Sequence, residues 1–365
     1  MLPLQDIIQE LERLAPLRLQ ESYDNSGLIT GDPSMNINSA LICLDSTEAV
    51  IDEAIRRGCN LVIAHHPIVF SGLKKITGSS YIERVIIKAI QNNIAIYAIH
   101  TNLDNVAQGV NAKICEQLGL QKTRILAPMA NQLKKLVTFT PIAASAAVKN
   151  AIFNAGAGDI GNYSECSFSV SGDGSFKGNE LSDPHIGKKG ERHVEKEERI
   201  EVIFPSGKEG AILSALMGAH PYEEVAYNIY SLTNLHPHLG AGMVGELEEP
   251  IKTEAFMDRI KDRMKAKVIR HTALIKKDIQ TVAVCGGSGS FLLNEAKKAT
   301  ADIFISADFK YHQFFDAEDK IIIADIGHFE TEQFTINLIG DYLREKFTTF
   351  AVLLTETNTN PIYYH

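Results

Sequence analysis

The segment Leu61–Pro67, with the sequence Leu-Val-Ile-Ala-His-His-Pro, constrains the fold more than any other stretch of the chain. Its four apolar residues are typical of a short strand that is buried on both faces of a parallel sheet. Pro67 lacks a backbone N–H and cannot extend a central strand, so the strand should end at His65 and His66. Open α/β sheets bind ligands at the carboxyl ends of their strands. The segment alone leaves two interpretations open: a ligand site, or one core histidine beside one loop histidine.

Strands and helices alternate along the chain on both sides of this segment, which predicts right-handed crossovers and a parallel sheet. Each expected strand is a short apolar run, and each expected helix has apolar residues on one face. The first half has strands at 40–45, 61–66 and 94–99 and helices at 3–14, 46–57, 80–92 and 108–118. The second half has strands at 281–285, 302–306, 320–326 and 350–354 and helices at 253–265, 291–298 and 329–345. We therefore expect an α/β domain built from two strand–helix–strand halves.

Residues 130–247, between the two halves, have a different pattern. Strands are expected at 135–140, 163–171, 199–204 and 225–232, and helices at 144–154 and 208–217. This βαββαβ order is that of a ferredoxin-like α+β domain. The densely charged block 187–199 is expected to form a solvated, twisted hairpin or a mobile loop. We therefore predict a discontinuous metal-binding domain of residues 1–129 and 248–365, with residues 130–247 inserted into it.

The composition is that of a soluble globular protein with two domains. A chain of 365 residues is about twice the usual size of one domain, and 45% of its residues are hydrophobic and 22% charged. The net charge of −9 argues against a protein that coats nucleic acid or anionic membranes. The sequence shows no signal peptide and no apolar stretch long enough to span a bilayer, so we expect a cytoplasmic protein.

Three of the expected strands end in residues that can bind metal ions. They are His65 and His66, His100 and Asp104, and His328 and Glu332. If the three strands are parallel in one sheet, these side chains converge at one rim, although each pair taken singly is common in ordinary loops and helices. Imidazoles and carboxylates without thiolates suit Zn, Fe, Mn, Co or Ni rather than a structural zinc site. Five or six ligands exceed the need of one four-coordinate ion, so a carboxylate that bridges two ions would explain the surplus.

A glycine-rich turn follows another expected strand, at Gly286-Gly287-Ser288-Gly289. Because it opens a helix, its amides could hold an anion, although a tight turn without a ligand explains it equally well. It matches neither the dinucleotide-binding pattern nor the P-loop pattern. Lys310 and His312 could face the same rim as the metal ligands. For either residue alone, the start of a surface helix is the better explanation.

Taken together, these motifs make the sequence resemble the Nif-three-like family (NGG-interacting factor three), whose bacterial members carry the label GTP cyclohydrolase I type 2 homologue. The resemblance covers essentially the whole chain. The motifs that carry it are Tyr23–Leu28, Ala64–Pro67, His100–Asp104, Val284–Gly289 and Gly327–Glu332. The inserted segment, with His220–Glu224 and Gly240–Gly245, is similar to the PII- or CutA-like middle domain of the longer family members.

The resemblance implies a dinuclear site for divalent metal ions and a ring-shaped homohexamer with its metal sites facing an internal cavity. The ligands that it implies are His65, His66, Asp104, His328 and Glu332. A second group of residues is expected to support these ligands or to contact substrate. That group is Asp24, Asn25, His100, Gly286, Gly287, Ser288, Lys310 and His312.

Two functions from different classes fit this pattern. The first is a metal-dependent hydrolase that acts on a nucleotide or another small molecule, with hydrolytic opening of a purine ring as the reaction if the substrate were GTP. The second is a non-catalytic ring protein that stores or delivers metal. A ring that encircles DNA is disfavoured by the net charge of −9.

Overall fold

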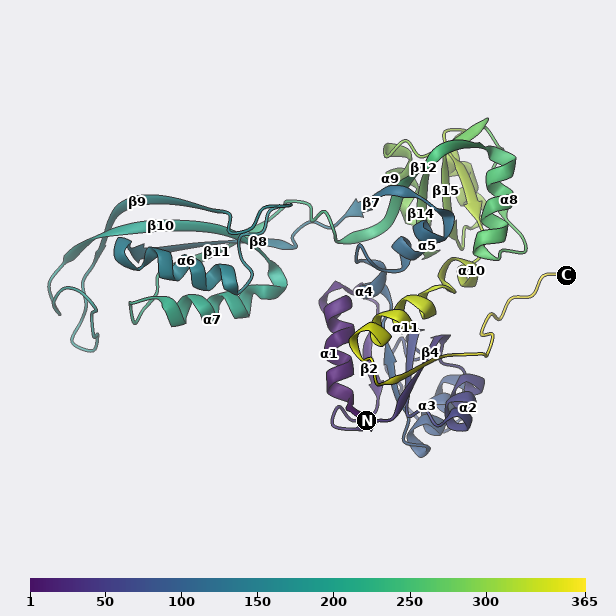
Figure 1. The fold of residues 1–365 in the computed structure, drawn as a ribbon, viewed down its shortest axis with the longest axis horizontal. Helices are drawn as coiled ribbons and strands as arrows, with labels where there is room; N and C mark the ends of the chain where they lie inside the picture. The colour runs from purple at the N-terminus through teal and green to yellow at the C-terminus, as the bar shows by residue number, and fades with distance from the viewer. The chain divides into compact units, whose positions relative to one another are not determined.

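The computed structural model describes residues 1–365, and the chain divides into two compact units (Figure 1). Unit 1 consists of Met1–Pro128 and Pro237–His365, and unit 2 consists of Met129–His236. The sequence placed the second boundary at residue 247, but residues 237–247 belong to unit 1. The reason is that strand β12 (Gly240–Lys252) pairs with β14 (Asp278–Ser288) and β7 (Gln121–Pro128), which are both strands of unit 1.

The first sheet of unit 1 has five strands in the order β17-β4-β5-β6-β2. The first four are parallel, and β2 is antiparallel to β6. Leu61 and Ile63 of β5 pack in one apolar cluster, and Val62 and Ala64 pack in another, so β5 is buried on both faces as its composition predicted. The strands are β2 (Gly27–Thr30), β4 (Ser39–Asp45), β5 (Leu61–His66), β6 (Ala95–Ala98) and β17 (Ala351–Leu354).

Four long helices cover this sheet. Buried residues of α2 and α3 join the cluster on one face, and those of α1 and α11 join the cluster on the other. Helix α2 begins after Thr47, whose hydroxyl accepts a hydrogen bond from the Val50 amide, and it ends at Gly58 in the left-handed conformation. The bounds are α1 (Leu4–Leu14), α2 (Glu48–Arg57), α3 (Tyr81–Gln91) and α11 (Thr335–Lys346).

The second sheet of unit 1 has six strands in the order β13-β16-β15-β14-β12-β7. Only β14, β15 and β16 are parallel to one another. Helices α5 and α8 pack on one face of this sheet, and α9 packs on the other. The elements not yet bounded are α5 (Val110–Leu118), α8 (Thr253–Met264), β13 (Arg270–His271), α9 (Leu293–Lys298), β15 (Ile303–Ala307) and β16 (Ile322–Asp325).

The expectation that the three ligand-bearing strands share one sheet is therefore wrong. Strands β5 and β6 lie in the first sheet, whereas β16 lies in the second. The two sheets also exchange strands between the halves of the chain. Strand β7, from the N-terminal half, closes the second sheet, and β17, from the C-terminal half, closes the first. Pairing over such long sequence separations leaves no local pattern in the sequence.

Short elements fill the connections of unit 1. The short helix α4 (Thr101–Asp104) follows β6, and α10 (His328–Glu332) directly precedes α11. Strands β1 (Leu2–Pro3) and β3 (Asn36–Ile37) form a separate two-stranded ribbon. None of the helices combines the length and the apolar character that crossing a bilayer would require.

Unit 2 has the βαββαβ order that the sequence predicted, with all strand pairs antiparallel and a sheet order of β11-β8-β10-β9. Its apolar core lies between the sheet and its two helices. From His193 onward, the charged block 187–199 is part of a long strand that pairs with β9, and therefore forms a hairpin rather than a loop. The elements are β8 (Leu133–Pro141), α6 (Ser145–Asn154), β9 (Ser167–Phe176), β10 (His193–Pro205), α7 (Glu209–Ala219) and β11 (Tyr227–Leu232).

Unit 1 is expected to fold without unit 2. The two points where the chain leaves and re-enters unit 1 are neighbours, because Pro128 of β7 pairs with Gly240 of β12. Replacing Met129–His236 by a short Gly/Ser linker should therefore leave a protein that unfolds cooperatively and keeps the metal content of the full chain. Circular dichroism during heating and elemental analysis would measure both. A deletion protein without a cooperative transition would show that unit 1 depends on unit 2.

Candidate metal centre

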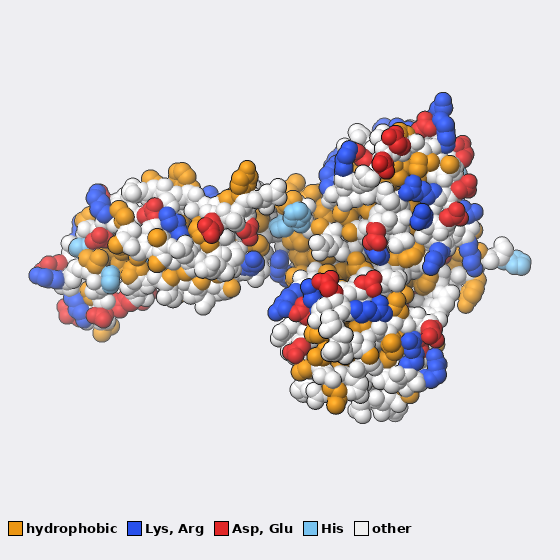
Figure 2. Space-filling view, viewed as in Figure 1, with side chains coloured by type: hydrophobic (Ala, Val, Ile, Leu, Met, Phe, Trp, Pro, Cys, Tyr) orange, Lys and Arg blue, Asp and Glu red, His pale blue; other side chains and the backbone are white.

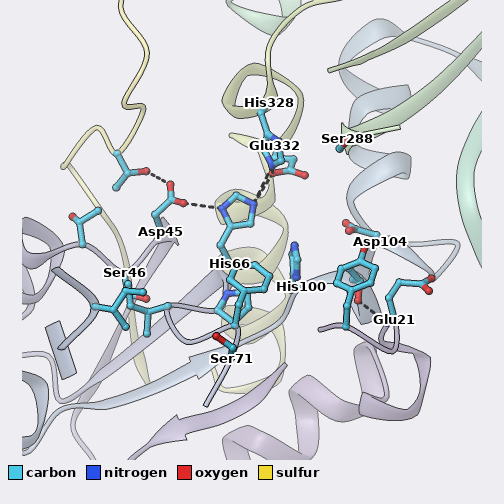
Figure 3. A pocket seen from close by; sticks show the side chains of 18 of the residues that line it. Glu21, Asp45, Ser46, His66, Ser71, His100, Asp104, Ser288, His328 and Glu332 are labelled. Carbon is cyan, nitrogen blue, oxygen red and sulfur yellow. Dashed lines mark hydrogen bonds and ion pairs between the residues drawn. The ribbon is translucent and has the colours of Figure 1, made fainter. Parts of the chain in front are cut away.

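Four histidines and two carboxylates meet in unit 1 at the carboxyl ends of strands from both sheets, and Figure 3 labels all of them but His65. All of them except the fully buried His65 border a cavity of about 1170 Å³. The first sheet supplies the last two residues of β5 and residues that follow β6, and the second supplies those of α10, which follows β16. The six residues are His65, His66, His100, Asp104, His328 and Glu332.

Each of the four imidazoles is held through its Nδ1 atom by an oxygen acceptor. An Nδ1–H that donates to oxygen fixes the tautomer and leaves Nε2 with a lone pair for a ligand. The same arrangement in all four rings is the arrangement of histidines that bind metal ions. The pairs are His65 with the Ile99 carbonyl (2.8 Å), His66 with Asp45 (2.7 Å), His100 with Asp24 (2.8 Å) and His328 with Asp308 (2.7 Å).

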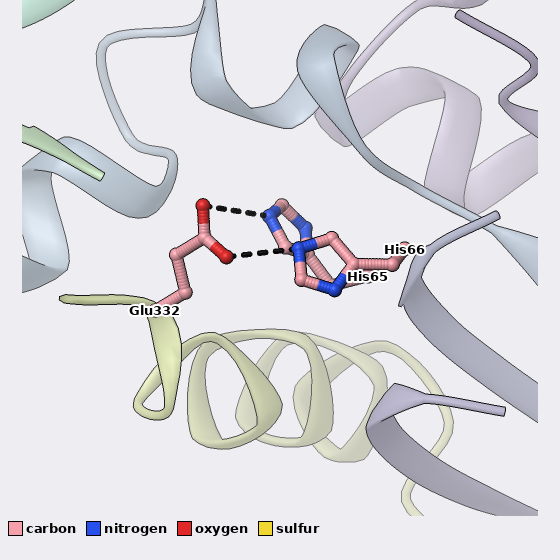
Figure 4. A group of neighbouring side chains, drawn as sticks. All are labelled: His65, His66 and Glu332. Carbon is pink, nitrogen blue, oxygen red and sulfur yellow. Dashed lines mark hydrogen bonds and ion pairs between the residues drawn. The ribbon is translucent and has the colours of Figure 1, made fainter. Parts of the chain in front are cut away.

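The carboxylate of Glu332 lies among three of these rings and is 3% exposed. Its Oε2 atom is 2.9 Å from Nε2 of His66 and 3.1 Å from Nε2 of His328. Its Oε1 atom is 3.8 Å from Nε2 of His65. Figure 4 shows one oxygen of Glu332 directed at each of the two neighbouring histidines. The two oxygens of one carboxylate thus face different imidazoles.

Two buried polar atoms at this point have no hydrogen-bond partner. They are Nε2 of His65 and Oδ1 of Asp104, which are 3.7 Å apart. Buried polar atoms are almost always paired, and an unpaired one destabilises the folded state. In addition, Nε2 of His66 and Nε2 of His328 are only 3.4 Å apart, a distance at which two lone pairs repel unless a proton or a cation lies near them. Bound metal ions would pair these buried atoms and separate the two nitrogens, so the residues present fit a metal site.

The pKa values of these groups reflect their crowding. Burial and the charge of Glu332 raise the pKa of Asp104 to about 7. Burial alone would lower the pKa of His66, but hydrogen bonds to Asp45 and Glu332 outweigh it and raise the pKa to about 10. The pKa of His328 is raised to about 11 against the effect of burial, chiefly by the charge of Glu332. Burial would raise the pKa of Glu332, but the neighbouring histidines, His328 foremost, hold it well below its usual value. In the metal-free protein, the Nε2 protons of His66 and His328 thus occupy the positions at which divalent cations would bind.

Comparison with known proteins decides the family. A sequence model of Duf34/NIF3 (NGG1p interacting factor 3) matches residues 2–361 of the chain. The chain belongs to the Duf34/NIF3 family. The resemblance seen in the sequence is confirmed.

Relatives in this family match nearly the whole chain. A protein of Halalkalibacterium halodurans named GTP cyclohydrolase 1 type 2 homolog is 40% identical over 326 residues, which are 89% of this chain and 88% of the relative. A protein of Bacillus subtilis with the same name is 37% identical and covers 99% of this chain and 98% of its own length. The crystal structure of a Bacillus cereus protein related to NIF3 has a TM-score of 0.85 and 36% identity over 99% of both chains. The mixed α/β fold of unit 1 is thus shared with NIF3 structures.

Two residues that orient candidate metal ligands in this NIF3 protein were not identified from the sequence. Asp45 is the last residue of β4 and binds Nδ1 of His66, and Asp308 directly follows β15 and binds Nδ1 of His328. Both stand at the carboxyl ends of parallel strands. The rule that singled out the histidines would therefore have found them, had it been applied to every strand and not only to those that end in histidine.

Asp24 and Asn25 support the site from behind rather than facing the cavity. Asp24 holds His100 through Oδ1, and its Oδ2 accepts a hydrogen bond from the amide of Thr101 at 3.1 Å. The amide group of Asn25 donates to the carbonyl of Val69 at 2.6 Å. The turn at these residues therefore links His100 to the loop after β5 through hydrogen bonds to both.

The amides of Gly286 and Gly287 in the glycine-rich turn are not free to bind an anion. The amide of Gly286 donates to Oδ1 of Asn111 at 3.0 Å, and that of Gly287 donates to Oγ1 of Thr331 at 2.9 Å. Strand β14 continues through these residues to Ser288, which lines the cavity. Gly287 instead leaves space for the carboxylate of Glu332, because a Cβ atom on Gly287 would lie 2.4 Å from Oε1 of Glu332. The anion-binding interpretation of Gly286 and Gly287 is wrong.

Lys310 and His312 do not line the cavity. Both are exposed, and His312 belongs to the 3₁₀ helix Tyr311–Ala317, where its ring contacts that of Tyr311. Asp308 has a positive φ of 58°, and the next residue, Phe309, is buried in the apolar cluster beneath α9. This turn takes the chain away from the metal centre, so the start of a surface helix is the correct interpretation of these two residues.

Substituting alanine for Gly287 should disrupt the candidate metal centre of this NIF3 protein. The new Cβ would meet Oε1 of Glu332 at 2.4 Å, and the φ of +59° is unfavourable for any residue but glycine. We expect metal content to fall strongly and stability to drop by at least about 1 kcal/mol. Gly72→Ala is the matched control, because Gly72 also lines the cavity but has open space around it. Equal metal content in both variants would contradict the close approach of Glu332.

Proposed function

We propose that this chain binds two divalent metal ions in the cavity of unit 1 and is a metal-dependent hydrolase. The observation that carries the proposal is the position of Glu332, whose two oxygens face two different sets of nitrogen and oxygen atoms. Its Oε2 lies near His66 and His328, and its Oε1 lies on the side of His65. A carboxylate can bind a different ion with each oxygen, so Glu332 would bridge the pair.

The remaining ligands divide between the two ions in the same way. His66 and His328 would complete the shell of one ion, and His65 and Asp104 would complete that of the other. The support is that His65 and Asp104 carry the two buried atoms without partners. Imidazole nitrogen and carboxylate oxygen suit Zn, Fe, Mn, Co or Ni. Such ions, when bound, polarise a substrate oxygen and activate water for hydrolysis.

His100 is the residue that we propose for proton transfer. Its ring lines the cavity, 5.3 Å from the ring of His65 and 5.4 Å from that of His66, measured between centroids. Asp24 holds its Nδ1 atom, which leaves Nε2 to accept or donate a proton. A base oriented by a buried carboxylate is a recurring arrangement in hydrolases.

The substrate that we propose is a nucleotide or another small molecule with a flat, anionic part. The support is the cavity lining, which includes the exposed aromatic rings of Tyr23, Phe70 and Phe291 and the lysines Lys74 and Lys75. Aromatic rings stack on flat groups, and lysines attract phosphate. The name GTP cyclohydrolase 1 type 2 homolog, which the relatives carry, is consistent with a nucleotide.

Metal analysis and a substrate screen would test the proposal together. The purified chain should contain two divalent ions, and hydrolysis of a nucleotide, phosphoester or amide substrate should stop when a chelator removes them. His100→Ala should lose turnover but keep its metal ions. Bound, exchangeable metal without turnover on any substrate would favour metal storage or delivery instead. A chain that binds no divalent metal would refute both.

The oligomeric state of the protein, its location in the cell and the fold class of unit 2 are also proposals. We propose a cytoplasmic homohexameric ring, supported by family membership and by the exposed, mutually contacting rings of Tyr311 and Phe315. We also propose a ferredoxin-like, PII- or CutA-like unit 2, supported by its sheet order. Nucleic acid is not proposed as a partner, since acidic and basic side chains are intermixed on the face in Figure 2. A single-chain mass by light scattering would contradict the hexamer.

A further inference from the structure

The segment 355–361, which follows β17, has no regular secondary structure but is held firmly against unit 1. The amide of Thr355 donates to the carbonyl of Ile42 at 2.9 Å, as if to extend β17 by one residue. Farther along, the side chain of Asn360 donates to Oε1 of Glu330 at 3.2 Å. Thr359 and Pro361 line the same cavity as the metal-binding residues. The segment therefore forms part of the wall of the site.

A buried carboxylate anchors the start of this segment. Glu53 of α2 is fully buried, and Arg57, one helical turn later, lies 2.6 Å from its Oε1. Burial would raise the pKa of Glu53, but its hydrogen bonds, that to Thr355 foremost, lower it to about 2, so it is ionised at neutral pH. The donors from the segment are Thr355 Oγ1 (2.6 Å), Glu356 N (2.9 Å), Thr357 N (3.2 Å) and Thr357 Oγ1 (2.7 Å). A buried charge saturated by four donors of one segment fixes that segment in place.

The anchored segment reaches a metal ligand through one hydroxyl group. Oγ1 of Thr359 donates to Oδ2 of Asp45 at 2.6 Å. The other oxygen of Asp45 accepts the hydrogen bond from Nδ1 of His66 at 2.7 Å, and Nε2 of His66 lies 2.9 Å from Glu332 (Figure 3). The hydroxyl of Thr359 thus occupies one oxygen of Asp45 and keeps the other directed at His66.

We propose that segment 355–361 is a strap that sets the orientation of His66, with Thr359 as the positioning residue and Glu53 as its anchor. The inference rests on the proposed metal site. Without the hydroxyl, the carboxylate of Asp45 can rotate, and His66 loses the acceptor that holds Nε2 toward the ion. Residues that orient metal-binding histidines contribute about 10-fold to 100-fold to metal affinity.

The first test compares three threonine variants by titration with Zn²⁺ against a chromophoric chelator. Thr359→Val removes the hydroxyl at nearly constant shape and should weaken binding of one of the two ions about 10-fold. Thr359→Ser keeps the hydroxyl and should restore wild-type affinity, which a purely steric role of Thr359 would not explain. Thr349→Val, at an exposed threonine of the turn before β17, should change nothing. The d–d spectrum of Co²⁺ should change in Thr359→Val and not in the other two. Wild-type affinity in Thr359→Val would overturn the inference.

The second test examines the anchor. Glu53→Gln should speed hydrogen exchange of the amides in 355–361 in the metal-free protein. It should also weaken Zn²⁺ binding as Thr359→Val does, although Glu53 contacts none of the proposed metal ligands. Thr357→Val, which removes one donor to Glu53, should act in the same direction and serves if Glu53→Gln does not fold. Faster hydrogen exchange in 355–361 with unchanged Zn²⁺ affinity would overturn the positioning role of Thr359. A wild-type chain that binds no Zn²⁺ would refute the proposed function instead, while hydrogen exchange would still report the anchor.

Discussion

Replacing Glu332 by alanine is expected to remove both metal ions, whereas replacing His65 or His66 should mainly remove one. The reason is that Glu332 presents Oε2 to His66 and His328 and Oε1 toward His65, so both ions lose a ligand in Glu332→Ala. Each histidine offers a single Nε2 atom and can serve only one ion. The measurement is the metal-to-protein ratio of the three purified variants beside the wild type.

Two controls make this result specific to the bridging position. Glu330→Gln alters a buried glutamate of the same short helix, α10, whose Oε1 accepts a hydrogen bond from Asn360 rather than facing a histidine. It should keep both ions. Circular dichroism of the metal-free proteins should show native folds, with Glu332→Ala less stable by about 3 kcal/mol because two imidazolium groups lose their counter-charge. If Glu332→Ala retains two ions per chain, Glu332 does not bridge.

Metal binding at pH 7 is expected to release about two protons per chain and to weaken about 100-fold for each pH unit of acidification near neutrality. In the metal-free protein, the pKa values of His66 and His328 are raised to about 10 and about 11, so both rings carry a second proton at pH 7. Each must lose the proton on Nε2 before that atom can bind a metal ion. Asp104, with a pKa raised to about 7, would add part of a third proton.

Calorimetry of Zn²⁺ binding in buffers with different ionisation enthalpies would count the protons. His271→Ala is a suitable control, because His271 is an exposed residue of β13 whose Nδ1 contacts the carbonyl of Thr272. It should release as many protons as the wild type. Release of no protons at pH 7 would contradict the protonated state of His66 and His328.

The same pKa values give the metal-free protein a defined pH dependence of stability. Groups whose pKa is raised on folding stabilise the fold fully below their unfolded pKa, which is about 6.5 for histidine. The contribution of His66 and His328 is therefore complete below about pH 6.5 and is lost progressively as the pH rises through about 10 and 11. The contribution of Glu332, whose pKa is lowered, is present above about pH 4.5 and is lost as the pH falls toward its folded value.

Much of this site could be predicted from local sequence. An apolar run followed by His65, His66 and Pro67 marks a buried strand and its end, and that end is where a parallel sheet exposes side chains. The spacing of His328 and Glu332 places both on one face of a helix. The chemistry of imidazole and carboxylate limits the metals further. The ends of the strands, the types of ligand residue and the family could therefore be predicted without knowledge of long-range contacts.

Other features depended on contacts between distant segments. Whether the amides of Gly286 and Gly287 could bind an anion was decided by Asn111 and Thr331, whose side chains take those hydrogen bonds. Thr359 lies in a segment without regular secondary structure, where the local sequence indicates no function for it. Its role follows only from its contact with Asp45, 314 positions earlier.

The sequence by itself determined the alternating elements, the inserted βαββαβ unit and the set of candidate metal-binding side chains, because these are properties of neighbouring residues. The tertiary structure alone decided that β5 and β16 lie in different sheets and that their ends nevertheless meet. Strand pairing joins segments hundreds of residues apart, and its energy depends on the packing of whole faces, which no local pattern records. It is this meeting of two sheets that brings Glu332 between His65 and His66.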